Sequence, residues 1–330
     1  MSQQYRYSLP ERRGDTRQLG QLTGSACAVE CAEIIERHDG PVMLITPDMQ
    51  TALRLRDEIQ QFSPQPVSTL SDWETLPYDS FSPHQDIISA RLSCLYHLPA
   101  MKRGVIILPI NTLMQRVCPH EFLHGHALVM KKGQHLSRDK LRAQLEQAGY
   151  RSVEQVMEHG EFATRGALLD LYPMGSNEPY RIDFFDDDID SLRVFDVDSQ
   201  RTLVEVEQIN LLPAHEFPID KAAIELFRSQ WREQFEVRRD NEHIYQQVSK
   251  GIWPAGIEYW QPLFFSQQLP TLFSYLPENT LLVNTGDLES SAERFWQDVN
   301  QRFESRRVDP MRPLLAPESL WLRLMRCLMN

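Results

Sequence analysis

The stretch YRIDFF at residues 180–185 places apolar side chains at its even positions and mostly polar ones at its odd positions. A period of two residues is that of a β-strand with one buried face, so Arg181 and Phe185 are expected to point to the same side. The acidic residues 186–188 then lead into a second apolar run at 189–197. The pattern therefore predicts a β-hairpin.

The sequence before this hairpin predicts the rest of an α+β module. Residues 167–171 form a short apolar run directly after Arg165 and Gly166, which predicts another strand. Residues 138–147 have a helical pattern, and Ser137 is a suitable N-cap for it. We expect a helix followed by a meander of strands.

The first third of the chain has a different pattern. Helices are expected at 27–37 and 49–62, and continuous apolar runs at 41–46 and 104–110 predict buried strands. Strands of this kind between helices indicate a parallel sheet covered on both faces. The second helix is expected to bury three apolar residues: Leu53, Ile59 and Phe62.

The last third is mostly helical in pattern. A long helix is expected at 219–237 and a short one at 243–248, and residues 319–330 are apolar and helix-like without an obvious cap. We therefore expect the chain to continue in a longer protein. The long helix carries four apolar residues at helical spacing: Ile224, Phe227, Trp231 and Phe235.

Composition and charge narrow the class of protein. The chain has 330 residues, 42% of them hydrophobic and 24% charged, and a net charge of −12. This length predicts two or three domains, and this charge disfavours nucleic acid as a stand-alone partner. No apolar run resembles a signal peptide or a membrane span, and the five cysteines show no paired spacing. We expect a cytoplasmic protein without disulfides.

Two segments carry a specific resemblance. The sequence RGALLDLYP at 165–173, followed by YRIDFFDD at 180–187, is similar to a segment shared by the repair protein UvrB and the transcription-repair coupling factors. In those families the module resembles a docking domain for UvrA, which implies a UvrA-binding site at Arg165, Arg181 and Phe185. Periodicity alone favours the simpler interpretation, an ordinary antiparallel sheet with one exposed Arg and one exposed Phe; the extended motif favours docking.

The resemblance to UvrB extends to its ATPase module, but the nucleotide-binding loop differs. In UvrB-like ATPases this loop reads GxTGSGKT, and its glycines, Lys and Thr hold the phosphates and magnesium. Here the two outer glycines, the Lys and the Thr are replaced. The corresponding positions are Gln21, Thr23, Gly24, Ser25, Ala26, Cys27 and Ala28. We expect this loop to be inactive; a turn that never bound phosphate predicts the same.

The Walker B position differs as well. An apolar run at 281–283 continues into Asn284, Thr285 and Gly286, where the ATPases have an acidic pair. We therefore expect an α/β fold with a degenerate P-loop, helicase-like parallel-sheet module at 26–127 that resembles UvrB domain 1a. The UvrA-binding α+β module is expected at 128–212, together with residues 1–25, and a helical α/β module similar to domain 1b at 213–330.

Two other stretches contain residue types that occur in functional sites. Cys118, His120, His124 and His126 are metal-ligand residue types, but their spacing is not that of a structural zinc site, so solvated or locally capped histidines are favoured. The stretch 73–96 is too short for the aromatic hairpin with which UvrB probes damaged DNA. We expect no metal site and no damage verification in this chain.

The resemblance implies a non-catalytic region of a transcription-repair coupling factor that recruits UvrA to RNA polymerase stalled at DNA lesions. ATP and Mg²⁺ would serve the translocase motor of the parent protein, and RNA polymerase and DNA would bind other parts of it. Two alternatives stay open. The region is either a structural or autoinhibitory arm that packs on the parent's other domains, or an active nucleotide hydrolase with unusual phosphate contacts.

Overall fold

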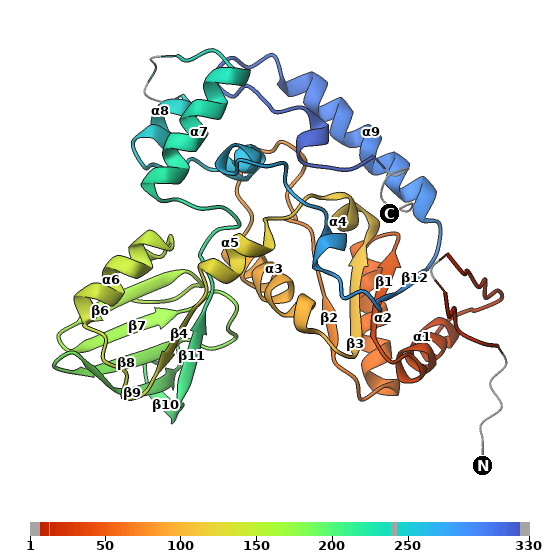
Figure 1. Cartoon of the computed structure of the whole chain (residues 1–330), viewed down its shortest axis with the longest axis horizontal. Coiled ribbons are helices and arrows are strands. Elements are labelled where there is room, and N and C mark those ends of the chain that lie inside the picture. The colour runs from red at the N-terminus through yellow and green to blue at the C-terminus, as the bar shows by residue number, and fades with distance from the viewer. Residues whose placement is uncertain (1–6, 13, 239, 241–242, 324–330) are drawn as a thin grey trace.

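A parallel sheet of four strands joins the first and last thirds of the chain in the computed structural model, which describes residues 7–12, 14–238, 240 and 243–323 (Figure 1). The strand order is β12-β1-β3-β2. Val42 of the central strand β1 aligns with Val105 of β3 and with Leu281 of β12. The expected parallel sheet is thus confirmed. Its strands are β1 (Pro41–Thr46), β2 (Val67–Thr69), β3 (Gly104–Pro109) and β12 (Leu281–Asn284).

Helices cover both faces of this sheet, as expected for strands that are apolar on both sides. α1 (Ala26–Arg37) and α2 (Met49–Phe62) share a buried cluster with one face. On the other face a larger cluster includes residues of α3 (Gln85–His97), α4 (Ile110–Met114) and α5 (His120–Gly125). The short 3-10 helix Leu98–Ala100 follows α3.

The predicted buried stripe of α2 is partly wrong. Leu53 and Phe62 are 37% and 50% exposed, whereas Ala52, Leu55 and Ile59 are fully buried. These three residues have the i, i+3, i+7 spacing of one helix face. The small side chain of Ala52 lies in the core that α2 shares with α1, a role that a search for large apolar residues does not detect.

The second sheet is the predicted meander. Its order is β10-β9-β8-β7-β6-β5, and all neighbours are antiparallel except β5 and β6. The six strands are β5 (Arg151–Ser152), β6 (Glu161–Arg165), β7 (Leu168–Tyr172), β8 (Tyr180–Phe185), β9 (Asp188–Phe195) and β10 (Thr202–Glu205). The strands expected at 167–171, 180–185 and 189–197 correspond to β7, β8 and β9, whose ends lie within two residues of the expected ones.

One helix packs on this sheet. α6 (Arg138–Gln147) places Leu141 and Leu145 in the same buried cluster as the sheet residues Phe162, Leu169 and Ile182. Ser137 precedes α6, but its side chain makes no capping hydrogen bond. A two-stranded ribbon of β4 (Leu128–Lys131) and β11 (Gln208–Leu211) adjoins the module.

Aromatic side chains form the core of the last third. The expected long helix is α7 (Lys221–Gln234), in which Phe227 and Trp231 are fully buried. The remaining elements are α8 (Ile244–Ser249), α9 (Leu288–Arg306) and the 3-10 helices Ile257–Phe264, Leu272–Tyr275 and Pro317–Ser319. Of the helix-like stretch expected at 319–330, residues 324–330 lie outside the described part of the chain.

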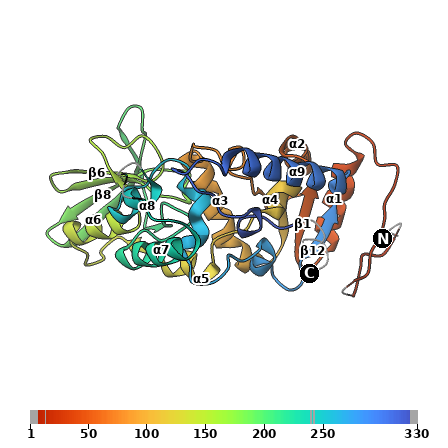
Figure 2. The same cartoon turned by 90° about the horizontal axis from the view of Figure 1, so that it is seen from above.

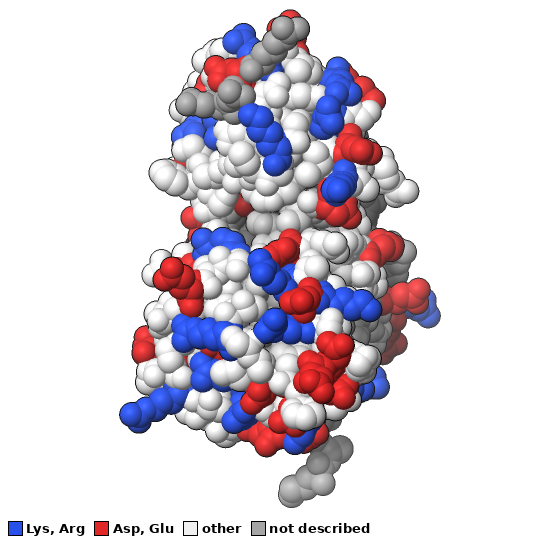
Figure 3. All heavy atoms as spheres, turned by 90° about the vertical axis from the view of Figure 1, so that its left-hand side faces the viewer, with Lys and Arg blue, Asp and Glu red and all other residues white. Residues whose placement is uncertain are grey.

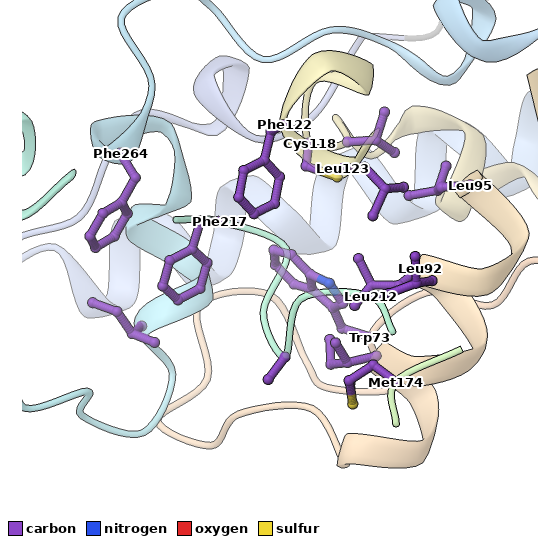
Figure 4. Packing of buried hydrophobic residues seen from close by; sticks show 14 of the residues in the cluster. Trp73, Leu92, Leu95, Cys118, Phe122, Leu123, Met174, Leu212, Phe217 and Phe264 are labelled. Atoms are coloured by element: carbon purple, nitrogen blue, oxygen red, sulfur yellow. The ribbon is translucent and has the colours of Figure 1, made fainter. Parts of the chain in front are cut away.

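The interior is continuous between the two sheets. Trp73, Phe122, Met174, Phe217 and Phe264, which come from all three thirds of the chain, belong to one buried cluster (Figure 4). A buried ion pair lies in the same region, because Arg91 donates from Nε to Glu216 at 2.9 Å and both side chains are at most 2% exposed. Trp73 donates to the second oxygen of the same carboxylate at 2.6 Å.

The first described residues, from Tyr7 on, lie far from the meander. Leu9 packs against the cluster of α1 and α2, and Tyr7 donates a hydrogen bond to Glu30 of α1. The six-stranded sheet lies at the other end of the molecule (Figures 1 and 2). The described part of 1–25 therefore accompanies α1 instead of the α+β module; residues 1–6 and 13 lie outside the description. The three-module division otherwise stays a prediction.

Candidate functional site

The six-stranded sheet has one face covered by α6 and one face turned away from it, which we call the outer face. Directly paired residues on neighbouring strands point to the same side of a sheet. Arg165, Leu168, Asp183 and Ser191 are paired in one row across β6 to β9. The next row is Ala163, Asp170, Arg181 and Arg193. Both rows lie on the outer face, so Arg165, Arg181 and Phe185 share a side as predicted.

One half of the outer face is covered by loops. Ala163 and Phe195 form a small buried cluster with Val156 from the loop before β6. The amide of Gln200, from the loop between β9 and β10, donates to the carbonyl oxygens of Val197 at 2.8 Å and of Val156 at 3.4 Å. These contacts join the two loops above the centre of the sheet.

Arg181 lies in this covered half, and the expectation that it is exposed is wrong. Its Nε and Nη2 donate to the two oxygens of Asp170 at 2.7 and 2.9 Å. Its Nη1 donates to Gln200 and Thr202, and its guanidinium lies 5.1 Å from the ring centre of Phe195. Only 15% of the Arg181 side chain and 4% of the Asp170 side chain are exposed. The guanidinium is therefore occupied within the protein.

The other half of the outer face is open. Phe185 is 73% exposed at the end of β8. Arg165 is exposed at the end of β6, where its Nη2 donates to the carbonyl of Glu154 at 2.9 Å. On β9, in the row of Arg181, Arg193 donates from Nη2 to Asp183 at 3.0 Å, and about a third of each side chain is exposed. On its other side Arg193 is paired directly with Glu205 of β10. Arg193 was not selected from the sequence, although it is the one arginine among the aspartates of the hairpin.

The two hairpin turns beside Arg165 and Phe185 are held by the loop before α6 and by the first residue of that helix. The amide of Gly133 donates to Ile189 at 2.7 Å, and the amide of Leu136 donates to Asp187 at 2.8 Å. Arg138 donates to the carbonyl of Gly166 in the turn between β6 and β7. These hydrogen bonds, two between backbone groups and one from the Arg138 side chain, hold both ends of the open half in a defined position. Charges of both signs alternate over this end of the molecule (Figure 3).

The loop that resembles a phosphate-binding loop is exposed, and no strand precedes it among the described residues. Residues 15–23 are irregular, and residues 21–26 are all exposed. A Cβ added to Gly24 would meet no atom within 4 Å, so no backbone or side chain closes over it. At the Lys position, the pKa of Cys27 is lowered to about 7 by a hydrogen bond with Cys31. A thiolate there would repel phosphate instead of attracting it.

The segment at the Walker B position packs against the first strand. The amide of Thr285 donates to Ile45 of β1 at 3.0 Å. Gly286 has a positive φ of 69°, and a Cβ added there would lie 2.6 Å from Pro47. Asn284, Thr285 and Gly286 therefore lie at the carboxyl edge of the parallel sheet without an acidic side chain among them.

The histidine-rich segment around α5 makes local contacts. His126 shares a hydrogen bond with the carbonyl of Phe122 at 2.8 Å, and the rings of His120 and His124 lie 4.1 Å apart. Cys118 is buried, and its carbonyl accepts a hydrogen bond from Tyr275 at 2.8 Å. Within the described ranges, no three His, Cys, Asp or Glu side chains are arranged to hold a metal ion. None of the described helices is long and apolar enough to cross a membrane.

Comparison with known proteins gives one family match and several relatives. Residues 128–217 match the family "UvrB interaction domain". The chain is 77% identical over 324 residues to the transcription-repair-coupling factor of Escherichia coli (strain K12). The matched residues make up 98% of this chain and 28% of that protein. The factor of Haemophilus influenzae is 57% identical over 317 residues, and that of Bacillus subtilis 27% over 291. The chain spans about a quarter of the length of these relatives.

Proposed function

Because the chain belongs to the family of transcription-repair-coupling factors, we propose that it is the region that recruits UvrA to RNA polymerase stalled at DNA lesions. The observation that carries this proposal is the position of the exposed residues. The match to the UvrB interaction domain covers residues 128–217, and the open half of the outer face, with Arg165 and Phe185, lies within that range.

The chemistry of the open half suits a protein partner. Aromatic and Arg side chains are the types most enriched at the energetic centres of interfaces. Phe185 offers an exposed aromatic ring, and Arg165 offers a charged fork that can bind a carboxylate. Because the nearby backbone is hydrogen-bonded, little conformational freedom is lost when a partner binds.

We further propose that this region has no catalytic residue, no bound nucleotide and no resident metal. In this proposal residues 26–127 are a degenerate P-loop module similar to UvrB domain 1a, and residues 213–330 correspond to domain 1b. The exposed loop at 21–28, the thiol at the Lys position and the neutral Asn284–Gly286 segment support it. ATP-driven translocation on DNA and binding of RNA polymerase would belong to the remainder of the parent protein.

The docking role is tested by equilibrium titration of the folded chain with purified UvrA. Replacing both Arg165 and Phe185 with Ala should weaken binding by at least about thirtyfold, since loss of one central anchor commonly costs about 2 kcal/mol. Arg142→Ala is a matched control, because Arg142 is ion-paired with Glu146 on α6, which covers the opposite face. Equal affinity of the folded double variant and the wild-type chain would refute the assignment.

A further inference from the structure

The two exposed residues assigned to docking each lie beside a hairpin turn, and the two turns are held in different ways. Phe185 directly precedes the turn between β8 and β9. Backbone groups join this turn to the loop before α6. The amide of Leu136 donates to Asp187 at 2.8 Å, and the amide of Ile189 donates to Gln134 at 3.0 Å. The position of this turn is therefore set by the backbone alone.

The turn between β6 and β7, which directly follows Arg165, has little packing around it. Residues 164–167 are all exposed, and a Cβ added to Gly166 would meet no atom within 4 Å. Within the sheet, the amide of Phe184 donates to the carbonyl of Ala167 at 3.1 Å. Among the described residues, the hydrogen bond that reaches Gly166 from outside the sheet comes from the side chain of Arg138.

Arg138 connects this turn to an element that is fixed in the core. It is the first residue of α6, and that helix buries Leu141 and Leu145. Its Nη1 donates to the carbonyl of Gly166, and a hydrogen bond from a charged donor is stronger than one between neutral groups. The position of the β6–β7 turn, and of Arg165 next to it, thus depends on a single side chain.

Resting on the docking role proposed above, we propose that Arg138 is a positioning residue for UvrA binding. It holds the β6–β7 turn so that Arg165 is presented in a fixed position relative to Phe185. A partner that contacts both residues loses affinity when one of them must be ordered during binding. Arg138 acts through Arg165 and not through Phe185, because the turn beside Phe185 is held by backbone hydrogen bonds.

The experiment is an equilibrium titration of UvrA with Arg138→Ala, with all samples checked for folding. We expect binding to weaken by about threefold to tenfold, the effect of losing one hydrogen bond of this kind. Arg138→Lys should retain part of the affinity, since an ammonium can donate to the same carbonyl. Arg142→Ala, four residues further along α6 and ion-paired with Glu146, is the control. Hydrogen exchange of residues 165–168 should be faster in Arg138→Ala and unchanged in the control.

Combining Arg138→Ala with the docking variants separates positioning from direct contact. Arg138→Ala should cost little further affinity in the Arg165→Ala background and should have its full effect in the Phe185→Ala background. Equal losses in both backgrounds would show that Arg138 touches UvrA itself, which would overturn the positioning role. Wild-type affinity of folded Arg138→Ala, with Arg165→Ala weakened, would also overturn it. Wild-type affinity of both Arg165→Ala and Phe185→Ala would reject the docking role instead.

Discussion

At the scale of single residues, sharing a face and being exposed are separate properties. The two-residue period places Arg181 and Phe185 on one side of β8 correctly. It contains no information on the loops that cover one half of that side. Phe185 is free in the structure, whereas Arg181 is bound to Asp170, Gln200 and Thr202. Substituting the two residues should therefore have different consequences.

Arg181→Ala should lower the free energy of unfolding by about 3 kcal/mol, because it leaves the carboxylate of Asp170 buried without its partner. Urea denaturation measures this. Arg165→Ala is the control and should change stability by less than about 0.5 kcal/mol, since that side chain is exposed. Adding Asp170→Asn to Arg181→Ala should restore part of the loss. An Arg181→Ala protein as stable as wild type would contradict the structural role.

Glu258 gives a prediction about pH. Its carboxylate is 6% exposed and accepts a hydrogen bond from Ser82 at 2.8 Å. Burial raises the pKa of Glu258 from 4.5 to about 7. Between these two pKa values the folded protein binds more protons than the unfolded chain, so the stability of the fold falls as pH rises. The stability contributed by this group is therefore complete below about pH 4.5 and is lost as pH rises through about 7.

Glu258→Gln should remove the loss of stability that Glu258 causes as pH rises. We expect the variant to be more stable than the wild-type protein at about pH 8, by up to about 3 kcal/mol, and to differ less from it at about pH 5. Denaturation curves at both pH values measure the difference. Glu278→Gln, at an exposed position, is the control and should follow the wild-type protein. The same pH dependence in Glu258→Gln and wild type would show that another group is responsible.

At the scale of elements, strong periodicity predicted most of what was observed. The parallel sheet, the meander and α7 were expected, because their apolar spacing is decided locally. The buried face of α2 was not predicted correctly, because it depends on the packing of α1 against α2. The loops over Arg181 were not expected either, because they depend on contacts between residues distant in sequence, such as Gln200 with Val156.

The loop at 21–28 leads to a prediction for this element. Phosphate binding needs backbone amides closed around the anion and a positive charge, and the loop is exposed and carries a thiol at the Lys position. Calorimetric titration of the chain with Mg²⁺ and ATP should give no saturable heat. Cys27→Lys is a useful comparison and should not create tight binding, because the metal-binding acidic pair is also absent. Saturation at micromolar ATP would contradict the non-catalytic assignment.

At the scale of the whole molecule, charge decides which partners approach. The chain carries a net charge of −12, and acidic and basic side chains alternate over the face in Figure 3 instead of forming one basic patch. A phosphate backbone is attracted by concentrated positive charge and repelled by a net negative field. A protein surface of mixed charge is recognised through local complementarity, which the open half of the outer face offers.

Binding of duplex DNA by the chain should therefore be weak, with a Kd no lower than the range of about 10⁻⁴ to 10⁻⁶ M typical of non-specific contacts at physiological salt. Fluorescence anisotropy with a labelled duplex at about 150 mM salt measures this. Phe185→Ala and Arg165→Ala should leave this weak affinity nearly unchanged while they reduce UvrA binding, because non-specific DNA binding depends on the summed charge of the chain and not on one aromatic or one Arg anchor. Nanomolar binding of DNA by the wild-type chain, lost in these variants, would instead identify the same surface as a nucleic-acid site.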